Sequence, residues 1–391
     1  MHAATLLTDF CMRPISRRSL LAATFLAAAA TTSCAAGPLP PPLVEPGPGA
    51  VALNTRARHK GLFYGCALND DTLTKDPATL ARIEAECGIV VAEWSFKWAA
   101  IHPKIDKYDF TSADALMAWA GKQKIQVRGH ALVWHEALPD WLPETLNAGN
   151  GEKLLTDHIH TVAGRYAKRL AHWDVVNEAI NVEDKQPGGL RNTIWLRALG
   201  PAYLDIAFHA TAVADPQALR VLNEYGTDYA IDWQERKRGA LLDLLSNLTH
   251  RRVPIQAVGL QAHLDAAETA LDQKILARFI ADIASMGLKV LITEFDVRDD
   301  RLPADIASRD TAVADHGRAW LDAVLPNPAV LGVLSWGISD RHSWLNDKYP
   351  RADGLAQRPL PLDEDLNRKK LWSGIAASLD AAPARGTPSR T

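Results

Sequence analysis

The sequence predicts a closed (β/α)₈ barrel, the TIM-barrel fold class, formed as a single domain by residues 55–380. Apolar, β-branched runs alternate with helical patterns along this whole range, and eight such runs are present. An open doubly wound sheet would want a glycine-rich phosphate loop after the first run, and residues 62–67 do not supply one. We expect strands near residues 62–65, 89–92, 125–128, 173–176, 220–222, 255–260, 290–292 and 330–335.

The composition fits one large ordered domain. The 391 residues are 47% hydrophobic and 23% charged, which provides ample apolar material for a core. The formal net charge of −3 shows no basic excess, so neither nucleic acid nor an anionic membrane surface is expected as a partner. Of the four cysteines only Cys66 and Cys87 fall in the predicted barrel, too few for a disulfide scaffold, and we do not assume that they pair.

The two ends of the chain differ from the barrel region. Residues 1–36 are predicted to be an export signal peptide. Arg17-Arg18 precede an alanine-rich run that is too short to span a bilayer in the mature chain. The arginine pair resembles the twin-arginine export motif of bacteria. We expect an exported protein, periplasmic or secreted, with lipid attachment through Cys34 as the alternative. Residues 37–54 are proline-rich and predict an extended tether, and residues 381–391 predict a disordered tail.

Helix signals fill the gaps between the strands. The pair Asp76-Pro77 is typical of an N-cap and a first helical residue, and Gly88 is suited to close that helix. Residues 111–114 resemble a capping box that opens another helix. His158 and His160 lie on a third helical pattern, and we expect them on its surface and not in a metal site.

Two glutamates follow directly on predicted strands. Glu178 comes after the apolar run 173–176, and Glu294 ends the β-type run 288–292, which places the two residues 116 positions apart. A single strand-end glutamate is more often a solvated loop residue or an ion-pair partner. In a closed barrel, however, all strand C-termini open on the same rim, so these two carboxylates can converge in one site.

The residues around both glutamates resemble a known enzyme family. Trp-Asp-Val-Val-Asn-Glu at 173–178 and Ile-Thr-Glu-Phe-Asp at 292–296 are similar to the acid/base and nucleophile signatures of family 10 of the glycoside hydrolases, the endo-β-1,4-xylanase family. This family has the barrel fold. The resemblance implies that Glu178 is the acid/base, that Glu294 is the nucleophile, and that Asn177 holds the 2-hydroxyl of the reacting sugar. It implies no cofactor and no metal.

Other strand ends match the same family in the same order. In this family the histidine of a Gln-x-His motif hydrogen-bonds the nucleophile, and residues 261–263 match that motif. His263 and Asp296 are therefore expected to support Glu294. At position 94 the family usually has asparagine, and this chain departs from it with Trp94, which we expect to contact the substrate on the glycone side. The resemblance implies the following substrate-binding positions: Glu93, Trp94, Lys97, His130, Trp134, Asn177, Tyr225, Gln261, Trp336 and Trp344.

The resemblance implies an endo-1,4-β-xylanase that hydrolyses internal bonds of xylan or xylo-oligosaccharides with retention of configuration. A related β-1,4-glycanase or a transglycosylase would use the same machinery. A catalytically inactive sugar-binding protein is a further alternative, although both glutamates and Asn177 are present. We expect the polysaccharide or oligosaccharide substrate as the partner and the protein as a monomer.

Overall fold

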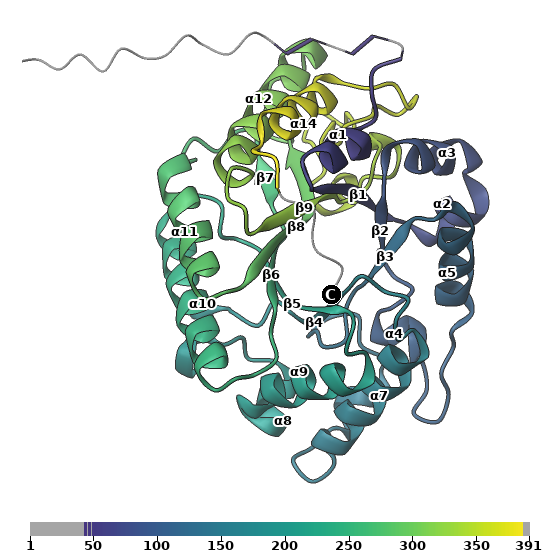
Figure 1. The fold of residues 1–391 in the computed structure, drawn as a ribbon, viewed down its shortest axis with the longest axis vertical. Coiled ribbons are helices and arrows are strands. Elements are labelled where there is room, and N and C mark those ends of the chain that lie inside the picture. Colours follow the sequence, from purple (N-terminus) through teal and green to yellow (C-terminus); the bar gives the residue numbers. More distant parts are fainter. Residues whose placement is uncertain (1–42, 45, 48, 386–391) are drawn as a thin grey trace, which may run out of the picture. The chain divides into compact units, whose positions relative to one another are not determined.

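The computed structural model describes residues 43–385 apart from residues 45 and 48, and in it the strands close into a barrel (Figure 1). Neighbouring strands follow the order β6-β5-β4-β3-β2-β1-β9-β8, and a further β6–β8 pairing closes the ring, with every pairing parallel. The predicted fold class is confirmed, and each predicted run overlaps one barrel strand. The barrel strands are β1 (Phe63–Leu68), β2 (Ile89–Ala92), β3 (Gln126–Gly129), β4 (His172–Asn177), β5 (Leu219–Glu224), β6 (Ala257–Leu260), β8 (Lys289–Arg298) and β9 (Val330–Ser335).

A short additional strand, β7 (His263–Asp265), was not expected. The chain leaves β6, passes through Ala262 in the left-handed conformation with φ of 61°, and then pairs in parallel with the end of β8. His263 lies opposite Asp296 in this pairing. The step therefore extends the rim of the barrel beside Glu294.

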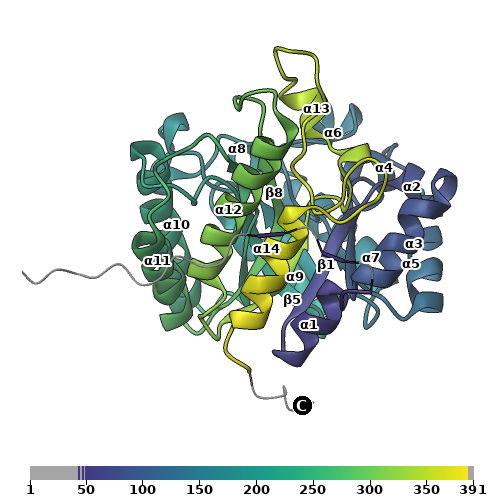
Figure 2. The ribbon, with the colours of Figure 1, turned by 90° about the horizontal axis from the view of Figure 1, so that it is seen from above.

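Helices surround the barrel on the outside (Figure 1). Seen from the side, α6 and α13 lie at one end of the barrel and α1 at the other (Figure 2). No helix among the described residues is long and apolar enough to cross a membrane. The helices are α1 (Leu53–His59), α2 (Asp70–Lys75), α3 (Pro77–Glu86), α4 (Trp98–Ile101), α5 (Thr111–Gln123), α6 (Trp141–Thr145), α7 (Gly151–Arg165), α8 (Ile194–Leu199), α9 (Ala202–Ala214), α10 (Asp232–His250), α11 (Gln273–Ser285), α12 (Ile306–Val324), α13 (Leu345–Lys348) and α14 (Lys370–Ala381), with 3₁₀ turns η1 (Val182–Asp184), η2 (Pro187–Gly189) and η3 (Asp340–His342).

The start of α3 is as predicted, and its end is not. Asp76 Oδ1 accepts a hydrogen bond from the backbone N–H of Thr79 at 3.0 Å, and Pro77 is the first helical residue. The helix ends in an extended Cys87 and not in a left-handed glycine. Gly88 serves close packing instead, because a Cβ at this position would lie 2.4 Å from the side-chain nitrogen of Asn54.

The predicted capping box of α5 is wrong. The N-cap is Phe110, and the backbone N–H of Thr111 donates to Asp109 Oδ1 at 3.0 Å. Asp114 is not turned to its own backbone because it accepts hydrogen bonds from Arg165 and Tyr166 at the end of α7. A tertiary ion pair has replaced a local cap.

The two histidines of α7 differ in burial. His160 is exposed, as predicted, but His158 is fully buried. Its ring stacks on Trp98 with centroids 3.4 Å apart, and its Nδ1 lies 3.2 Å from Nδ1 of His102. Burial lowers the pKa of His158 well below its ordinary value, so the ring is neutral and packs as an aromatic core residue.

The ordered domain extends past both predicted boundaries. Leu53, inside the predicted tether, is fully buried at the start of α1, and the carbonyl of Val44 accepts a hydrogen bond from Ser373 Oγ at 2.6 Å. In the predicted tail Ala382 is buried, and Arg385 donates to the carbonyl of Leu325 at 2.7 Å. The described residues of both ends therefore join the domain through buried apolar side chains and through hydrogen bonds. The predicted export segment, residues 1–36, lies outside the described residues.

The two cysteines of the barrel are buried free thiols. Their Sγ atoms lie 3.6 Å apart, which is contact without a bond.

Candidate active site

A cleft of about 850 Å³ opens at the carboxyl ends of the barrel strands. Both strand-end glutamates line it, although they lie far apart in the sequence. Glu93 and Trp94 stand beside the cleft and are not among the described residues that line it. Most of the residues predicted for the site do line it, namely Lys97, His130, Trp134, Asn177, Glu178, Tyr225, Gln261, His263, Glu294, Asp296, Trp336 and Trp344.

Glu294 is held as a carboxylate. It is buried on β8, where its Oε1 accepts a hydrogen bond from Asn223 Nδ2 at 2.7 Å and its Oε2 lies 3.2 Å from His263 Nε2. Burial alone would raise the pKa of Glu294, but the hydrogen bond from His263 and the positive charge around the site lower it to about 2. A buried, fully ionised carboxylate of this kind can act as a nucleophile.

His263 is held in its charged form. Burial would lower the pKa of the imidazole, but Asp296, and after it Glu294, raise this pKa well above the ordinary value. Its Nδ1 lies 2.9 Å from Asp296 Oδ1, and Trp344 Nε1 donates to the other Asp296 oxygen at 2.8 Å. The imidazolium therefore donates from both nitrogens, and the same carboxylate fixes an aromatic ring of the cleft.

Glu178 stands directly past β4 in a left-handed backbone conformation with φ of 58°. Its backbone N–H donates to the carbonyl of Asn223 at 2.8 Å, which fixes the turn. Its Oε1 accepts hydrogen bonds from Gln261 Nε2 at 3.1 Å and from Asn177 Nδ2 at 3.3 Å. Its Oε2 lies 4.0 Å from the Arg191 guanidinium. One carboxylate oxygen is thus oriented by amides, and the other faces a cation.

Asn223 is a site residue that the sequence analysis missed. It is fully buried on β5, and its Nδ2 donates both to Glu294 and to Asn177 Oδ1 at 2.9 Å, while its Oδ1 accepts from Thr293 Oγ1 at 2.7 Å. Side chains thereby connect the two glutamates through Asn223 and Asn177. Asn223 stands next to Glu224 in the sequence, and nothing in its neighbours distinguishes it from an ordinary strand residue.

Arg191 was also missed, and no local pattern marks it. It lies in the segment between η2 and α8, from which its Nε donates to the carbonyl of Glu178 at 2.8 Å and its Nη2 to Tyr225 Oη at 2.9 Å. The guanidinium therefore joins the acid/base candidate to the aromatic residue at the end of β5.

A buried ion pair lies next to the ring of Tyr225. Glu224 and Lys237 are both buried, with Lys237 Nζ 2.8 Å from Glu224 Oε2 and 3.6 Å from the centroid of the Tyr225 ring. Glu224 Oε1 accepts from the backbone N–H of Ile180 at 2.7 Å. The pair therefore holds the chain just after Glu178.

Four of the predicted substrate-binding residues lie beyond the ends of β2 and β3, namely Glu93, Trp94, Lys97 and Trp134. Lys97 Nζ lies 4.8 Å from the centroid of the Trp134 ring and 5.8 Å from that of Trp94. Burial lowers the pKa of Lys97 against the opposing effect of the carboxylates around it. Glu93 is held by Asn69 Nδ2 at 3.3 Å, and Trp94 is 47% exposed. A cation, a carboxylate and large aromatic surfaces are thus available for sugar hydroxyls and ring faces.

His130 and Trp336 line the cleft next to each other. His130 Nδ1 lies 2.8 Å from Asp174 Oδ2, and the His130 ring meets Trp336 edge to face at 5.6 Å. Asp174 is also paired with the buried Arg128. These contacts fix the orientation of both rings.

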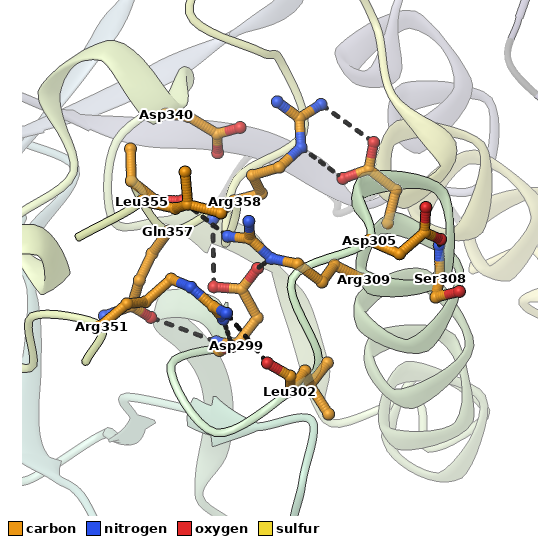
Figure 3. Close-up of polar contacts among 12 residues, drawn as sticks. Asp299, Leu302, Asp305, Ser308, Arg309, Asp340, Arg351, Leu355, Gln357 and Arg358 are labelled. Carbon is orange, nitrogen blue, oxygen red and sulfur yellow. Dashed lines mark hydrogen bonds and ion pairs between the residues drawn. The ribbon is translucent and has the colours of Figure 1, made fainter. Parts of the chain in front are cut away.

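A buried ion cluster ties the loop after β8 to the loop after β9 (Figure 3). Arg309 Nε donates to Asp299 Oδ2 at 2.7 Å, and Arg351 donates to the carbonyl of Asp299. Gln357 accepts from the Asp299 backbone N–H at 3.1 Å and donates to the carbonyl of Leu345 at 2.9 Å. Because Leu345 begins α13, the cluster secures the segment that places Trp344 in the cleft.

Among the described residues no group of three or more histidine, cysteine, aspartate or glutamate side chains could hold a metal ion.

The family model for glycosyl hydrolase family 10 matches residues 52–378. The chain belongs to glycosyl hydrolase family 10. Among its curated relatives, endo-1,4-β-xylanase B of Thermotoga neapolitana is 34% identical over 295 residues, which are 74% of this chain and 80% of the relative. Endo-1,4-β-xylanase 5 of Pyricularia oryzae is 31% identical over 347 residues, which are 86% of this chain and 80% of the relative.

Solved structures agree with this family 10 assignment. Native xylanase 10B from Thermotoga maritima superposes with a TM-score of 0.77 at 29% identity, covering 84% of this chain and 98% of that one. Xylanase 10B from Thermotoga petrophila RKU-1, solved in complex with xylobiose, gives the same TM-score and identity, covering 84% of this chain and 97% of that one. The resemblance to family 10 found in the sequence is confirmed.

Proposed function

We propose that this family 10 protein is an endo-1,4-β-xylanase that hydrolyses internal bonds of xylan or xylo-oligosaccharides with retention of configuration. The observation that carries the proposal is the buried carboxylate Glu294, held ionised by His263 in the same cleft as Glu178. The relatives named as endo-1,4-β-xylanases, and the similar xylanase 10B solved with xylobiose, support xylan as the substrate.

The reaction proceeds in two displacements. Glu294 attacks the anomeric carbon while Glu178 donates its proton to the leaving oxygen, which breaks the glycosidic bond and forms a covalent glycosyl-enzyme. Water then attacks the same carbon, gives its proton to Glu178 and releases Glu294. Asn177, next to Glu178 and bonded to Asn223, is placed to hold the 2-hydroxyl of the reacting sugar.

The remaining predicted residues bind the sugar chain around this point. On the glycone side, Lys97 and His130 offer polar contacts, and Trp336 and Trp344 offer aromatic faces. Glu93 and Trp94 lie just beyond the cleft and belong to the more distant glycone contacts. Trp134, beside Lys97, offers a further aromatic face. Tyr225 and Gln261 follow β5 and β6, which lie across the strand ring from β1 and β2, and they complete the set.

Substitution of each glutamate tests the roles. Glu294→Ala should abolish glycosylation for every substrate. Glu178→Ala should keep glycosylation of aryl xylosides, whose leaving group needs no proton, and azide should accelerate its turnover and yield the β-glycosyl azide. An α-glycosyl azide, or azide rescue of the Glu294 variant alone, would reverse the assignment.

The preferred polysaccharide is tested by comparing rates on linear xylan, mixed-linkage glucan and cellulose. Xylan should be hydrolysed fastest. A faster rate on either glucan would instead identify a related β-1,4-glycanase, and longer products formed from xylo-oligosaccharides would identify a transglycosylase.

We also propose that the protein is bacterial and exported by the twin-arginine route to the periplasm or the medium, where it acts as a monomer. Arg17-Arg18 and the alanine-rich run after them support this proposal. Cys34 offers lipid attachment as the alternative to simple cleavage.

A further inference from the structure

Trp233 presents an aromatic face in the cleft that the reaction described above does not use. It is the second residue of α10, it is 38% exposed, and it lines the same cleft as both glutamates. Exposed tryptophan rings are uncommon in water because their large apolar surface favours burial. A ring left open inside a binding cleft therefore indicates a ligand surface.

The backbone of Gly226 holds this ring in place. A Cβ at Gly226 would lie only 2.5 Å from Cη2 and Cζ3 of Trp233, so the indole rests directly on the glycine backbone. Gly226 has φ of 68°, in the region that favours glycine, and it directly follows Tyr225. The two aromatic residues therefore belong to one wall of the cleft. Tyr225 is the one linked to Glu178 through Arg191, and Trp233 follows it at the start of α10.

The order of the strands around the barrel indicates which end of a bound sugar chain meets this wall. Glu93 and Lys97 follow β2 and Trp336 follows β9, and in the ring of strands β2, β1 and β9 are neighbours. Strand β5 lies on the opposite side of the ring, beyond β4, whose end carries Glu178. A sugar chain that runs from the first side past Glu178 therefore passes Tyr225 and then Trp233 on the side of the leaving group.

We propose that Trp233 is a stacking platform for the second sugar on the leaving-group side, next to the sugar bound at Tyr225. The apolar C–H face of a β-1,4-linked xylose unit suits the open face of the indole, and the hydroxyls at the ring edge stay in water. This inference rests on the proposed function. It means that the enzyme favours bonds with at least two sugars on the leaving side.

Two substrates of different reach test the platform. Xylohexaose extends across Trp233, whereas 4-nitrophenyl β-xylobioside ends at the first leaving-side position. In Trp233→Ala the ratio of kcat/KM on xylohexaose to kcat/KM on the aryl substrate should fall about three- to tenfold, the range expected for one aromatic stacking contact. Cleavage of end-labelled xylohexaose should also shift toward bonds that leave a single sugar.

Two further variants complete the test. Trp233→Tyr keeps an aromatic face and should restore most of the ratio. Val213→Ala removes an exposed apolar side chain of α9 outside the cleft and should leave both substrates as in the wild type. An unchanged ratio and cleavage pattern in Trp233→Ala would overturn the platform while xylan hydrolysis stands. A wild-type enzyme that cleaves neither xylan nor xylohexaose would instead overturn the proposed function, and this inference with it.

Discussion

Replacing His263 by alanine should move the acid limb of the pH profile of kcat/KM upward. The acid limb reports the essential base of the free enzyme, which is Glu294 in the proposed mechanism. In the wild type the pKa of this carboxyl lies at about 2, although burial opposes its ionisation. The variant loses both the hydrogen bond and the positive charge of His263. With the His263 contribution removed and burial still opposing ionisation, the pKa of Glu294 should rise from about 2 toward its ordinary 4.5.

The size of the effect follows from the ionised fraction of Glu294. At pH 4 a carboxyl with a pKa of about 2 is almost fully ionised, whereas one with a pKa of about 4.5 is only about a quarter ionised. Near pH 6.5 both are ionised. Between these two pH values, kcat/KM should therefore fall more in His263→Ala than in the wild type, by up to about fourfold. A loss caused by misplacement of the nucleophile would be the same at all pH values and would not change this ratio.

Initial rates on 4-nitrophenyl β-xylobioside, read after an alkaline stop, give this profile. Asp296→Asn should shift the limb in the same direction, because Asp296 contributes most to keeping His263 charged. His160→Asn, which changes an exposed histidine of α7, should leave it in place. An acid limb of His263→Ala that coincides with the wild-type limb would refute the idea that His263 maintains the charge of Glu294.

Three more predictions follow from other parts of the chain. Arg309→Met should lower the free energy of unfolding by about 3 to 5 kcal/mol in urea titrations, because it leaves the buried Asp299 uncompensated, whereas the exposed Lys153→Met should change it little. Trp94→Asn should alter the product pattern on xylo-oligosaccharides by changing the hold of the distal glycone position, and identical products would exclude a substrate contact at Trp94. Replacing Arg17-Arg18 by two lysines should leave the precursor in the cytoplasm, and undiminished export detected by cell fractionation would argue against the twin-arginine route.

The barrel could be predicted because its strands are buried on both faces. Such strands appear as short apolar runs, and the polar residue that ends each run falls on the common rim, which made Glu178 and Glu294 visible. Patterns of this kind depend on neighbours in the sequence. They therefore predict which residue ends each strand, but not which side chains of different strands contact each other.

The missed features depend on contacts across the fold. Asn223 matters because side chains of β4 and β8 meet it on β5, and Arg191 because a loop folds back over Glu178. For the same reason the capping box of α5 failed, since Asp114 found partners on another helix. His158 was misplaced because a helical pattern alone does not show that Trp98 covers that face.

The step between β6 and β7 constrains how this enzyme can evolve. Gln261 bonds Glu178, and His263, two residues later, bonds Glu294, with the left-handed Ala262 between them. Inserting or deleting one residue here would disengage both carboxylates together, so this stretch can vary in composition but not in length. Residues 267–272, which follow β7 and lead into α11, are half-buried or exposed, and they do not bond either catalytic carboxylate. Insertions there could reshape the neighbouring cleft wall and leave the chemistry untouched.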